Sequence, residues 1–490
     1  MDEYVKFIRK FAVYDVLEYI SNESYDISKN YDGEVKYEKI YTFNKKTKEA
    51  IQRTLIITQW DLLEASFNAI VYGTDYRSKK FKREDFIEYI NLTKKNNEQL
   101  EKANEFKEED LIAHIICLLN KQIPYQNKMT LSGFNRLYHI MLVINKDKKY
   151  DQTHQVNYID FESKFLEITG MEMKKFIICY LNISLLSLIR YKEDILDIPE
   201  VVFPFLDKVG ITKNDIVKAI KLQSCQYEFY KNGYTNSNIL MGYPIVCSER
   251  FKDKYIITNY SALNINLSTV VYWIIKNYYH EKESSAFTEY FGHCFEFYLS
   301  DFFNSYDIKA TKIKETSKKM PDWILETNKY IFLIEQKSGL LPIDVKSNTA
   351  EKRFKALQKY ITDNFYNAFE QLNNYTPSSN KITIRMCLTF ENIYGTEEIQ
   401  SIVLKKYEDK EDYHLNWIIC IDDFEKLFNL YTKDEIEFNK IIENKIELER
   451  NKDNNGRNFG KLLNNLPNDY ALNKINYIDI IIENLKIPNK

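Results

Sequence analysis

Glycine and proline are scarce in this sequence, which has 12 glycines and 9 prolines in 490 residues. Because both residues interrupt regular structure, their scarcity favours long helices over an all-β architecture. The seven cysteines form no Cys-x-x-Cys pair, which excludes the spacing of a zinc ribbon. The most apolar stretch, residues 176–189, is uncharged but shorter than the ~20 residues that span a bilayer. We therefore expect a buried helix there and no membrane partner.

Several motifs of hydrolytic and nucleotide-dependent enzymes are also missing. No Gly-x-Ser-x-Gly, His-Glu-x-x-His or Gly-x-Gly-x-x-Gly motif occurs. Residues 456–462 superficially resemble a phosphate-binding loop, but they have one residue too few between Gly456 and Gly460. Leu462 also stands where serine or threonine would bind magnesium. These differences exclude an ATPase or helicase engine of this type.

Apolar and aromatic residues are plentiful, at 44% and 15% of the chain. These fractions are enough for sizeable cores, and the length predicts about two to four domains. The net charge is −3, so the chain as a whole carries no basic signal for nucleic acid. The odd number of cysteines and the lack of a signal peptide predict a reducing, cytoplasmic location.

The first 240 residues carry apolar side chains mainly at helical spacing. We expect helices over 1–25, 54–72, 78–110, 109–119, 134–144, 161–189 and 211–223, with a loop or weak hairpin over 27–48. His114 and Cys117 lie three residues apart on one of these helices, a spacing that can bind a metal. No further ligand pair is near them in the sequence, so a buried core histidine is the favoured interpretation.

The composition changes over residues 232–264, where glycine, proline and asparagine occur together. Short β-like runs are expected at 238–241, 245–247 and 255–258, followed by a helix over 265–279. We therefore place a domain junction here. The predicted divisions are a helical domain over 1–240, a junction with a lead-in helix over 241–284, an α/β domain over 285–440 and a helical tail over 441–490.

Two short apolar strands, joined by a turn at Thr327-Asn328, are predicted next. The second strand ends in Glu335 and Lys337, and charges there are costly unless they are paired. A turn centred on Thr327-Asn328 places Asp322 opposite Leu333 and diagonal to Glu335. Because side chains alternate along a strand, Asp322, Glu335 and Lys337 should share one face. A turn centre shifted by half a residue would swap the faces.

The pattern Pro321-Asp322, twelve residues, then Glu335-Gln336-Lys337 resembles the PD-(D/E)XK nuclease superfamily, which has the restriction-endonuclease-like fold. The resemblance implies that Asp322, Glu335 and the Gln336 backbone carbonyl bind a divalent cation, and that Lys337 positions or activates water. Magnesium suits such oxygen ligands, and manganese is expected to substitute for it. A bound cation polarises a phosphodiester and lowers the pKa of water.

The Glu-x-Lys element alone carries little weight, since it also occurs at 105–107, 172–174 and 443–445 without an upstream Pro-Asp. The alternative interpretation is an ordinary edge hairpin with a surface Glu–Lys pair. Residues 308–360 contain twelve Lys or Arg and six Asp or Glu, a local net charge of +6. This charge suits a polyanion, and the alternative is a solvated lysine-rich surface.

Two helices extend the resemblance. A helix over 286–303 contains Gly292-His-Cys-Phe-Glu296, which is similar to the family's first core helix and implies that Glu296 reaches the metal site. Residues 349–375 are expected to be helical and end in Gln371-x-x-x-Tyr375, similar to a motif of the exonuclease branch whose side chains face the active site. The alternative for each is an ordinary helix surface.

We therefore predict a mixed α+β and α/β protein: a mostly helical N-terminal region followed by a restriction-endonuclease-like core, with a mixed central sheet flanked by helices. The resemblance covers about residues 286–424 and implies a magnesium-dependent (endo)deoxyribonuclease. Its catalytic residues would be Asp322, Glu335, Lys337, Glu296 and Gln371, and its metal ligands Asp322, Glu335, Gln336 and Glu296. By fold-level analogy the function would be restriction or anti-phage defence.

The N-terminal region would then serve as a sensor, a specificity module or a docking platform for a partner protein or a second copy. Three alternatives remain open. One is a nuclease-fold protein that binds nucleic acid without cutting it, and another is an RNA-directed nuclease. The third is a helical interaction protein in which the Pro-Asp and Glu-x-Lys match is coincidental.

Overall fold

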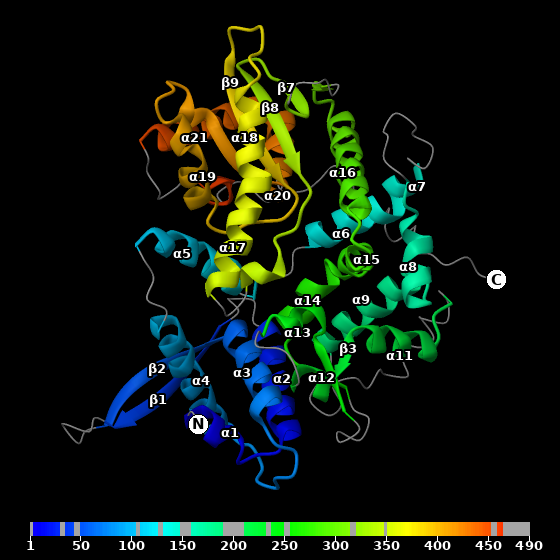
Figure 1. The fold of residues 1–490 in the computed structure, drawn as a ribbon, viewed down its shortest axis with the longest axis vertical. Helices are drawn as coiled ribbons and strands as arrows, with labels where there is room; N and C mark the ends of the chain where they lie inside the picture. The colour runs from blue at the N-terminus through cyan, green and yellow to red at the C-terminus, as the bar shows by residue number, and fades with distance from the viewer. Residues whose placement is uncertain are drawn as a thin grey trace.

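The computed structural model describes residues 3–29, 35–43, 50–103, 108–125, 131–147, 158–189, 210–231, 237–248, 255–313, 320–346, 350–451 and 458–463. Within these ranges the chain is a mixed α/β protein rich in helices, with sheets of two, three and five strands (Figure 1). No helix in the same ranges is long and apolar enough to cross a membrane. Much of the predicted tail, residues 452–457 and 464–490, lies outside the described residues.

The N-terminal part packs helices beside a two-stranded antiparallel hairpin. Its elements are α1 (Glu3–Ile8), α2 (Val13–Lys29), β1 (Val35–Phe43), β2 (Ala50–Thr58), α3 (Gln59–Tyr72), α4 (Arg83–Ala103), α5 (Glu108–Gln122) and the 3-10 helix η1 (Ile123–Tyr125). The single helix expected over 1–25 is two helices, because Phe11 and Ala12 form β-bridges to Lys79 and Thr74. Among the described residues of 27–48, for which a loop or weak hairpin was expected, only β1 is a strand, and it pairs with β2, which lies beyond that segment.

The helix expected from Thr54 begins instead at Gln59. Thr58 is its N-cap: the Thr58 hydroxyl accepts a hydrogen bond from Asp61 N at 3.2 Å, and Thr58 N donates to the Asp61 carboxylate at 2.8 Å. This capping box satisfies two backbone N–H groups at the helix start. The residues before it, 50–58, therefore extend as β2 rather than as helix.

A second group of elements leads from the N-terminal part to the large sheet. It comprises α6 (Leu131–His139), the π-helix η2 (Ile140–Ile144), α7 (Asn145–Asp147), α8 (Phe161–Thr169), α9 (Met173–Ile189), α11 (Lys213–Leu222), β3 (Ser224–Gln226), α12 (Tyr227–Lys231), α13 (Ile239–Gly242), β4 (Ile245–Cys247), β5 (Tyr255–Ile257), α14 (Tyr260–Leu267) and α15 (Val270–His280). The helix expected over 161–189 is broken at Gly170, a left-handed C-cap with φ of 64°.

Two expectations for the junction region were wrong and two are confirmed. Residues 239–242 are the helix α13, not a strand, and the helix expected over 265–279 is split between α14 and α15. Strands β4 and β5 lie where β-like runs were expected and pair antiparallel with each other. Short apolar runs are ambiguous between helix and strand, which explains the error at α13.

The C-terminal part contains the five-stranded sheet. Its elements are α16 (Ala286–Ser305), β6 (Ala310–Lys312), β7 (Trp323–Glu326), β8 (Tyr330–Lys337), η5 (Ile343–Lys346), α17 (Ala350–Ile361), the π-helix η6 (Thr362–Tyr366), α18 (Asn367–Asn373), β9 (Ile382–Thr389), α19 (Thr396–Leu404), η7 (Lys405–Tyr407), η8 (Tyr413–Leu415), β10 (Asn416–Cys420), α20 (Ile421–Lys433), α21 (Glu435–Arg450) and α22 (Phe459–Leu463). The strand order is β10-β9-β8-β7-β6.

Strands β8, β9 and β10 run parallel, whereas β6 and β7 are antiparallel to their neighbours. This arrangement confirms the expected mixed sheet flanked by helices. The more specific restriction-endonuclease-like identity of this core stays a prediction. Parallel pairing of β8 with β9 requires a crossover, which α17 and α18 provide across one face of the sheet (Figure 1).

Alternating residues of β8 pack into different cores on the two faces of the sheet. Phe332 and Ile334 belong to the core that also contains residues of α16, α20 and α21. Ile331 and Leu333 belong to the core formed with α17, α18, α19 and α5. Because the alternation continues along the strand, Glu335 lies on the face covered by α17 and α18.

The second group of elements and the C-terminal part share the largest core. Buried residues of α6, α9 and α11 belong to the same cluster as residues of β7, β8, β9 and β10. A buried ion pair adds to this contact: Arg136 on α6 donates to Glu425 on α20 at 2.9 and 3.0 Å, and to Asp422 at 2.5 Å. The domain boundary predicted at residue 240 stays a prediction, and the two sides of it are in extensive contact.

We expect Arg136→Ala to lower the free energy of unfolding by about 3–5 kcal/mol, because it leaves the Glu425 carboxylate buried without its cation. Urea denaturation followed by circular dichroism measures this change. The matched control is Lys329→Ala, which removes an ion pair with Glu443 in which both side chains are 55% exposed. Such an exposed pair contributes little to stability, because water screens it. An equal effect of the two substitutions would contradict a structural role for Arg136.

Candidate active site

Strands β7 and β8 form a hairpin whose register places the predicted acids side by side. Trp323 pairs with Ile334, and Asp322 N donates to the Ile334 carbonyl at 2.9 Å. The two-residue turn lies at Asn328-Lys329, one residue later than predicted. The predicted pairing of Asp322 with Leu333 is therefore wrong, and Asp322 continues the ladder opposite Glu335.

Although the predicted register of the hairpin was wrong, the predicted face of Asp322 is correct. A turn centre that moves by one whole residue changes the cross-strand partner by two positions, and residues two apart on a strand point to the same side. Asp322 and Glu335 are therefore direct cross-strand neighbours on the face that packs against α18, closer than the predicted diagonal pair. The shared face of Asp322 and Glu335, on which the sequence-based prediction depended, is therefore present, and the two side chains are closer than predicted.

Each of the two acids is held by a hydrogen bond from the end of β8. Asp322 Oδ2 accepts a hydrogen bond from Gln336 N at 2.8 Å. Lys337 Nζ donates to Glu335 Oε1 at 2.8 Å. Glu335 is only 3% exposed, whereas Asp322 and Lys337 are partly buried. The two carboxyl groups and the ammonium therefore form one cluster at the carboxyl end of a central strand.

The two carboxyl groups of this cluster are unfavourable to each other when both are charged. Burial and the charge of Glu335 raise the pKa of the Asp322 carboxyl to about 7, although the Gln336 N–H acts in the opposite direction. Burial also raises the pKa of Glu335, and the ammonium of Lys337 offsets part of this effect. Burial by itself would lower the pKa of Lys337, but the charge of Glu335, its hydrogen bond with Lys337 and the charge of Asp322 act together to raise that pKa. One cation thus faces two acids that disfavour being charged together.

Gln371 reaches the same cluster from α18. Its Nε2 donates to the Met320 carbonyl at 3.3 Å, and its side chain is near enough to Glu335 to lower the pKa of that carboxyl. Tyr375 does not share a helical face with Gln371 as predicted, because α18 ends at Asn373. Tyr375 instead packs against the core between α17, α18 and the sheet.

Glu296 and the Gln336 side chain lie on the other face of the sheet. Gln336 Oε1 accepts from Trp323 Nε1 at 3.1 Å, and its Nε2 donates to the Gly292 carbonyl of α16 at 3.4 Å. Glu296, also on α16, forms an ion pair with Lys312 of β6. The predicted roles of Glu296 and of the Gln336 carbonyl as metal ligands stay predictions.

Lys312 was not singled out from the sequence, although it belongs to the basic segment 308–360. Its charge acts on Asp322 as well as on Glu296. The signal that would have identified it is weak, because β6 has only three residues. His293 lies 3.6 Å from Glu296, measured between Nδ1 and Oε2, on the same helix.

His114 and Cys117 are part of the core, as favoured from the sequence. His114 is 7% exposed, and its Nδ1 lies 2.6 Å from Arg353 Nη2 on α17. Cys117 is buried in the core beside it. The seven cysteines are described and none of them forms a disulfide, and Cys179 and Cys387 are buried as expected.

The donor atoms of the cluster fit a hard divalent cation. In the described ranges no group of three or more His, Cys, Asp or Glu side chains is arranged to hold a metal. Magnesium, however, is usually bound by one or two carboxylates together with waters and substrate phosphates. Glu335 Oε2 is buried and accepts no hydrogen bond from a described residue. A buried carboxylate oxygen that accepts no hydrogen bond is suited to bind a cation.

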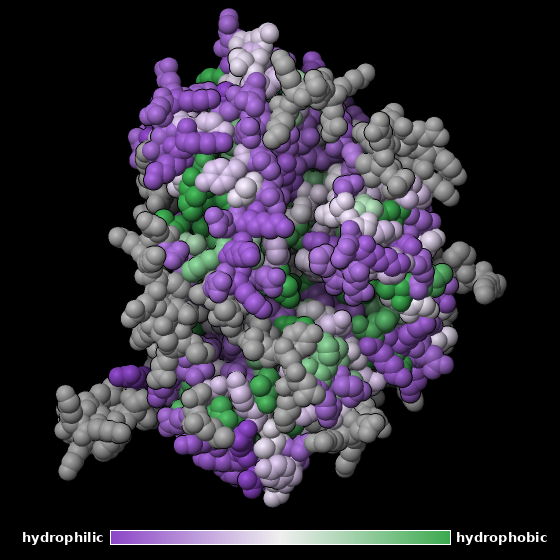
Figure 2. Space-filling model, viewed as in Figure 1, coloured by the Kyte–Doolittle hydropathy of each residue, from purple (hydrophilic) through white to green (hydrophobic). Residues whose placement is uncertain are grey.

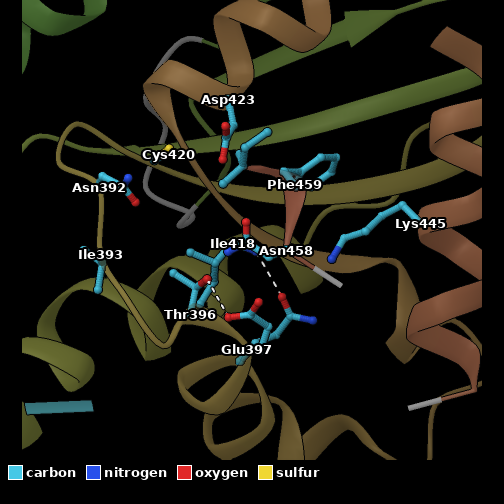
Figure 3. Close-up of a pocket in the computed structure, with 12 residues that line it drawn as sticks. Asn392, Ile393, Thr396, Glu397, Ile418, Cys420, Asp423, Lys445, Asn458 and Phe459 are labelled. Carbon is cyan, nitrogen blue, oxygen red and sulfur yellow. Dashed lines mark hydrogen bonds between the residues drawn. The ribbon is translucent and has the colours of Figure 1, made fainter. Parts of the chain in front are cut away.

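A small hollow lies elsewhere, beside β10, α19 and α20 (Figure 3). It is lined by Asn392, Ile393, Thr396, Glu397, Gln400, Ile418, Ile419, Cys420, Asp423, Lys445, Asn458 and Phe459. Ile418 N donates to Gln400 Oε1 at 3.2 Å within it. The lining contains no residue of the Asp322–Glu335–Lys337 cluster, so the hollow is separate from the candidate site.

No protein-family model, curated protein or solved structure matched this chain. The nuclease interpretation therefore depends on the identity of the clustered residues and on their geometry.

We expect the stability of the metal-free protein to fall as pH rises from about 4 to about 7. Asp322 has an ordinary pKa of 3.8 when unfolded and about 7 when folded, so the folded protein binds more protons in this window. Asp322→Asn removes the effect, and its stability relative to the wild type should rise by ~1–3 kcal/mol between pH 5 and pH 8. Urea denaturation in EDTA at several pH values measures this difference.

Glu326→Gln is the control for that experiment. Glu326 lies on the same strand, is exposed, and has a pKa that Lys381 lowers. Its replacement should give no gain in relative stability with rising pH. A difference between wild type and Asp322→Asn that stays constant from pH 5 to pH 8 would show that folding does not raise the pKa of Asp322.

Proposed function

We propose that this protein is a metal-dependent nuclease that hydrolyses phosphodiester bonds in DNA, with magnesium as its cofactor and manganese as a substitute. The observation that carries the proposal is the cross-strand contact of Asp322 with Glu335, beside Lys337, at the end of a central strand. Two acids on adjacent strands with a lysine two residues after the second acid are the arrangement that the sequence resemblance implies.

Each residue of the cluster has a distinct role in this proposal. Asp322 and Glu335 would hold the cation, and the Gln336 N–H and the Lys337 ammonium keep the two carboxyls in place. When bound, the cation would polarise the phosphate and lower the pKa of the attacking water. Lys337 stands beside Glu335, where its charge would offset the negative charge that develops on the phosphate. Gln371 would orient the site from α18.

A nucleic-acid substrate has support from charge. The sequence over 308–360, which contains β6, β7 and β8, has a net charge of +6 in a chain whose overall net charge is −3. Cations concentrated around a cluster of acids suit a substrate that carries phosphates. By fold-level analogy the activity would serve restriction or anti-phage defence, with the N-terminal helices recognising the signal or the partner.

Asp322→Ala and Glu335→Ala should each reduce magnesium-dependent cleavage by about 100-fold or more, since each removes a cation ligand. The assay incubates the full chain with plasmid DNA and with RNA, each with magnesium, manganese or EDTA. Glu326→Ala is the matched control, because it removes an exposed acid from the same strand. Cleavage that both variants retain would refute the proposal. Binding of plasmid without any cutting would instead indicate a nuclease-fold binding protein, and cutting of RNA alone an RNA-directed enzyme.

Lys337→Ala should lower kcat by about 100- to 1,000-fold, with a smaller change in KM, because its charge acts mainly where negative charge develops. Lys337→Arg keeps the charge and should restore part of the rate. Single-turnover cleavage of a labelled duplex measures both values. If Lys337→Ala changes KM alone, Lys337 acts in substrate binding instead.

A further inference from the structure

The hairpin of β1 and β2 stands apart from the site and has no role in the proposed chemistry. It extends from the N-terminal helices at the lower left of the molecule, whereas β7 and β8 lie at the top (Figure 1). The two strands pair along nine residues each, from Val35 with Thr58 to Phe43 with Ala50. A sheet of only two strands is marginally stable alone and needs support from neighbouring elements.

That support is concentrated at one end of the hairpin. Leu55 and Ile57 are buried in the N-terminal core. Glu38 is 5% exposed and bonds Arg83 of α4 at 2.5 Å, while Lys36 bonds Glu23 of α2 at 2.6 Å. The end of the hairpin near Val35 and Thr58 is therefore fixed to the body, and the strands project from it as a ribbon.

One face of this ribbon is exposed and carries aromatic, apolar and basic side chains together. Tyr37 and Ile56 are direct cross-strand partners and are 66% and 45% exposed. The next partners on that face, Lys39 and Thr54, are also exposed. Arg53 is also exposed, but its side chain leaves β2 on the opposite face, the face that carries Leu55 and Ile57. No ion pair joins Lys39 or Arg53 to another residue that the structure describes.

The charge of the ribbon differs from that of the chain. Residues 35–58 carry six Lys or Arg and two Asp or Glu, a net charge of +4, against −3 for the whole chain. In Figure 2 the described surface beside the base of the ribbon, at the lower left, is hydrophilic. A basic side chain such as Lys39, which forms no ion pair with a described residue and shares a face with the exposed Tyr37, is suited to phosphates and to base edges.

We infer that the β1–β2 ribbon enters the major groove of duplex DNA and anchors the substrate away from the cleavage site. The inference rests on the proposed function for its choice of DNA. The major groove of B-form DNA is about 12 Å wide and admits a two-stranded β-ribbon. Tyr37, Lys39 and Thr54 face the groove floor, and Arg53, on the opposite face of the ribbon, reaches a phosphate at the groove edge. The major groove of A-form RNA is too deep and narrow for such a ribbon.

The test measures binding of the full chain to a fluorescein-labelled 20-base-pair DNA duplex by anisotropy, in EDTA so that nothing is cut. Lys39→Ala/Arg53→Ala should weaken binding by about 10-fold and reduce the slope of log affinity against log salt by about 2. Tyr37→Ala should weaken binding with no change in that slope. These side chains are exposed, so the thermal melting temperature of both variants should match that of the wild type.

Lys213→Ala/Lys440→Ala is the matched control, because it removes two exposed lysines from α11 and α21. Ribbon variants that bind the DNA duplex like this control would overturn the inference. An equal loss of affinity on an RNA duplex would overturn it as well, since the contact would then be with phosphates of any helix. A change in oligomeric mass with unchanged DNA affinity would assign the ribbon to a protein contact and likewise overturn it.

These experiments can refute the DNA-binding inference and the proposed nuclease activity independently of each other. If the ribbon variants lose duplex affinity but the wild type cuts nothing with magnesium, the inference stands and the proposed nuclease activity falls. If the wild type cuts DNA and the ribbon variants bind it as tightly as the wild type, the activity stands and the inference falls.

Discussion

The contact between the carboxyl groups of Asp322 and Glu335 is the constraint on which the rest of the structure around the site depends. Two acids opposite each other on adjacent strands repel when both are ionised, and burial makes this repulsion costly. The sheet nevertheless holds them there, because β8 is paired along its length with β9 and, on the other side, with β7. The Gln336 N–H and the Lys337 ammonium offset part of the cost. A divalent cation would offset the remainder.

The elements around this pair explain why β8 is held so firmly. Its apolar residues pack into two different cores, one on each face of the sheet, so the strand cannot slip in register without burying charge. The larger core extends into α6, α9 and α11, and Arg136 links α6 to α20 across the interior. The sheet that carries the candidate site therefore shares one core with these helices, whereas the β1–β2 ribbon projects from the opposite end.

Much of the site was predictable because it depends on local patterns. The apolar strands, the turn between them and the alternation of side chains placed Asp322, Glu335 and Lys337 on one face. The turn was predicted one residue too early, since Thr327-Asn328 and Asn328-Lys329 are both acceptable turn sequences and side-chain packing selects the second. The helical extent around Tyr375 was overestimated, although Asn374, the C-cap of α18, and Pro377 are signals of a helix end.

The amino-acid sequence by itself determined the helix-rich character, the Pro-Asp and Glu-x-Lys strands and the shared face of their charged residues, because these follow from spacings of two and of three to four residues. Only the tertiary structure decided which helix covers which face. It brought Gln371 to the acids and placed Glu296 beside Lys312 on the other face of the sheet. It also left one face of the β1–β2 ribbon uncovered. Such contacts join residues far apart in the chain, and local periodicity carries no information about them.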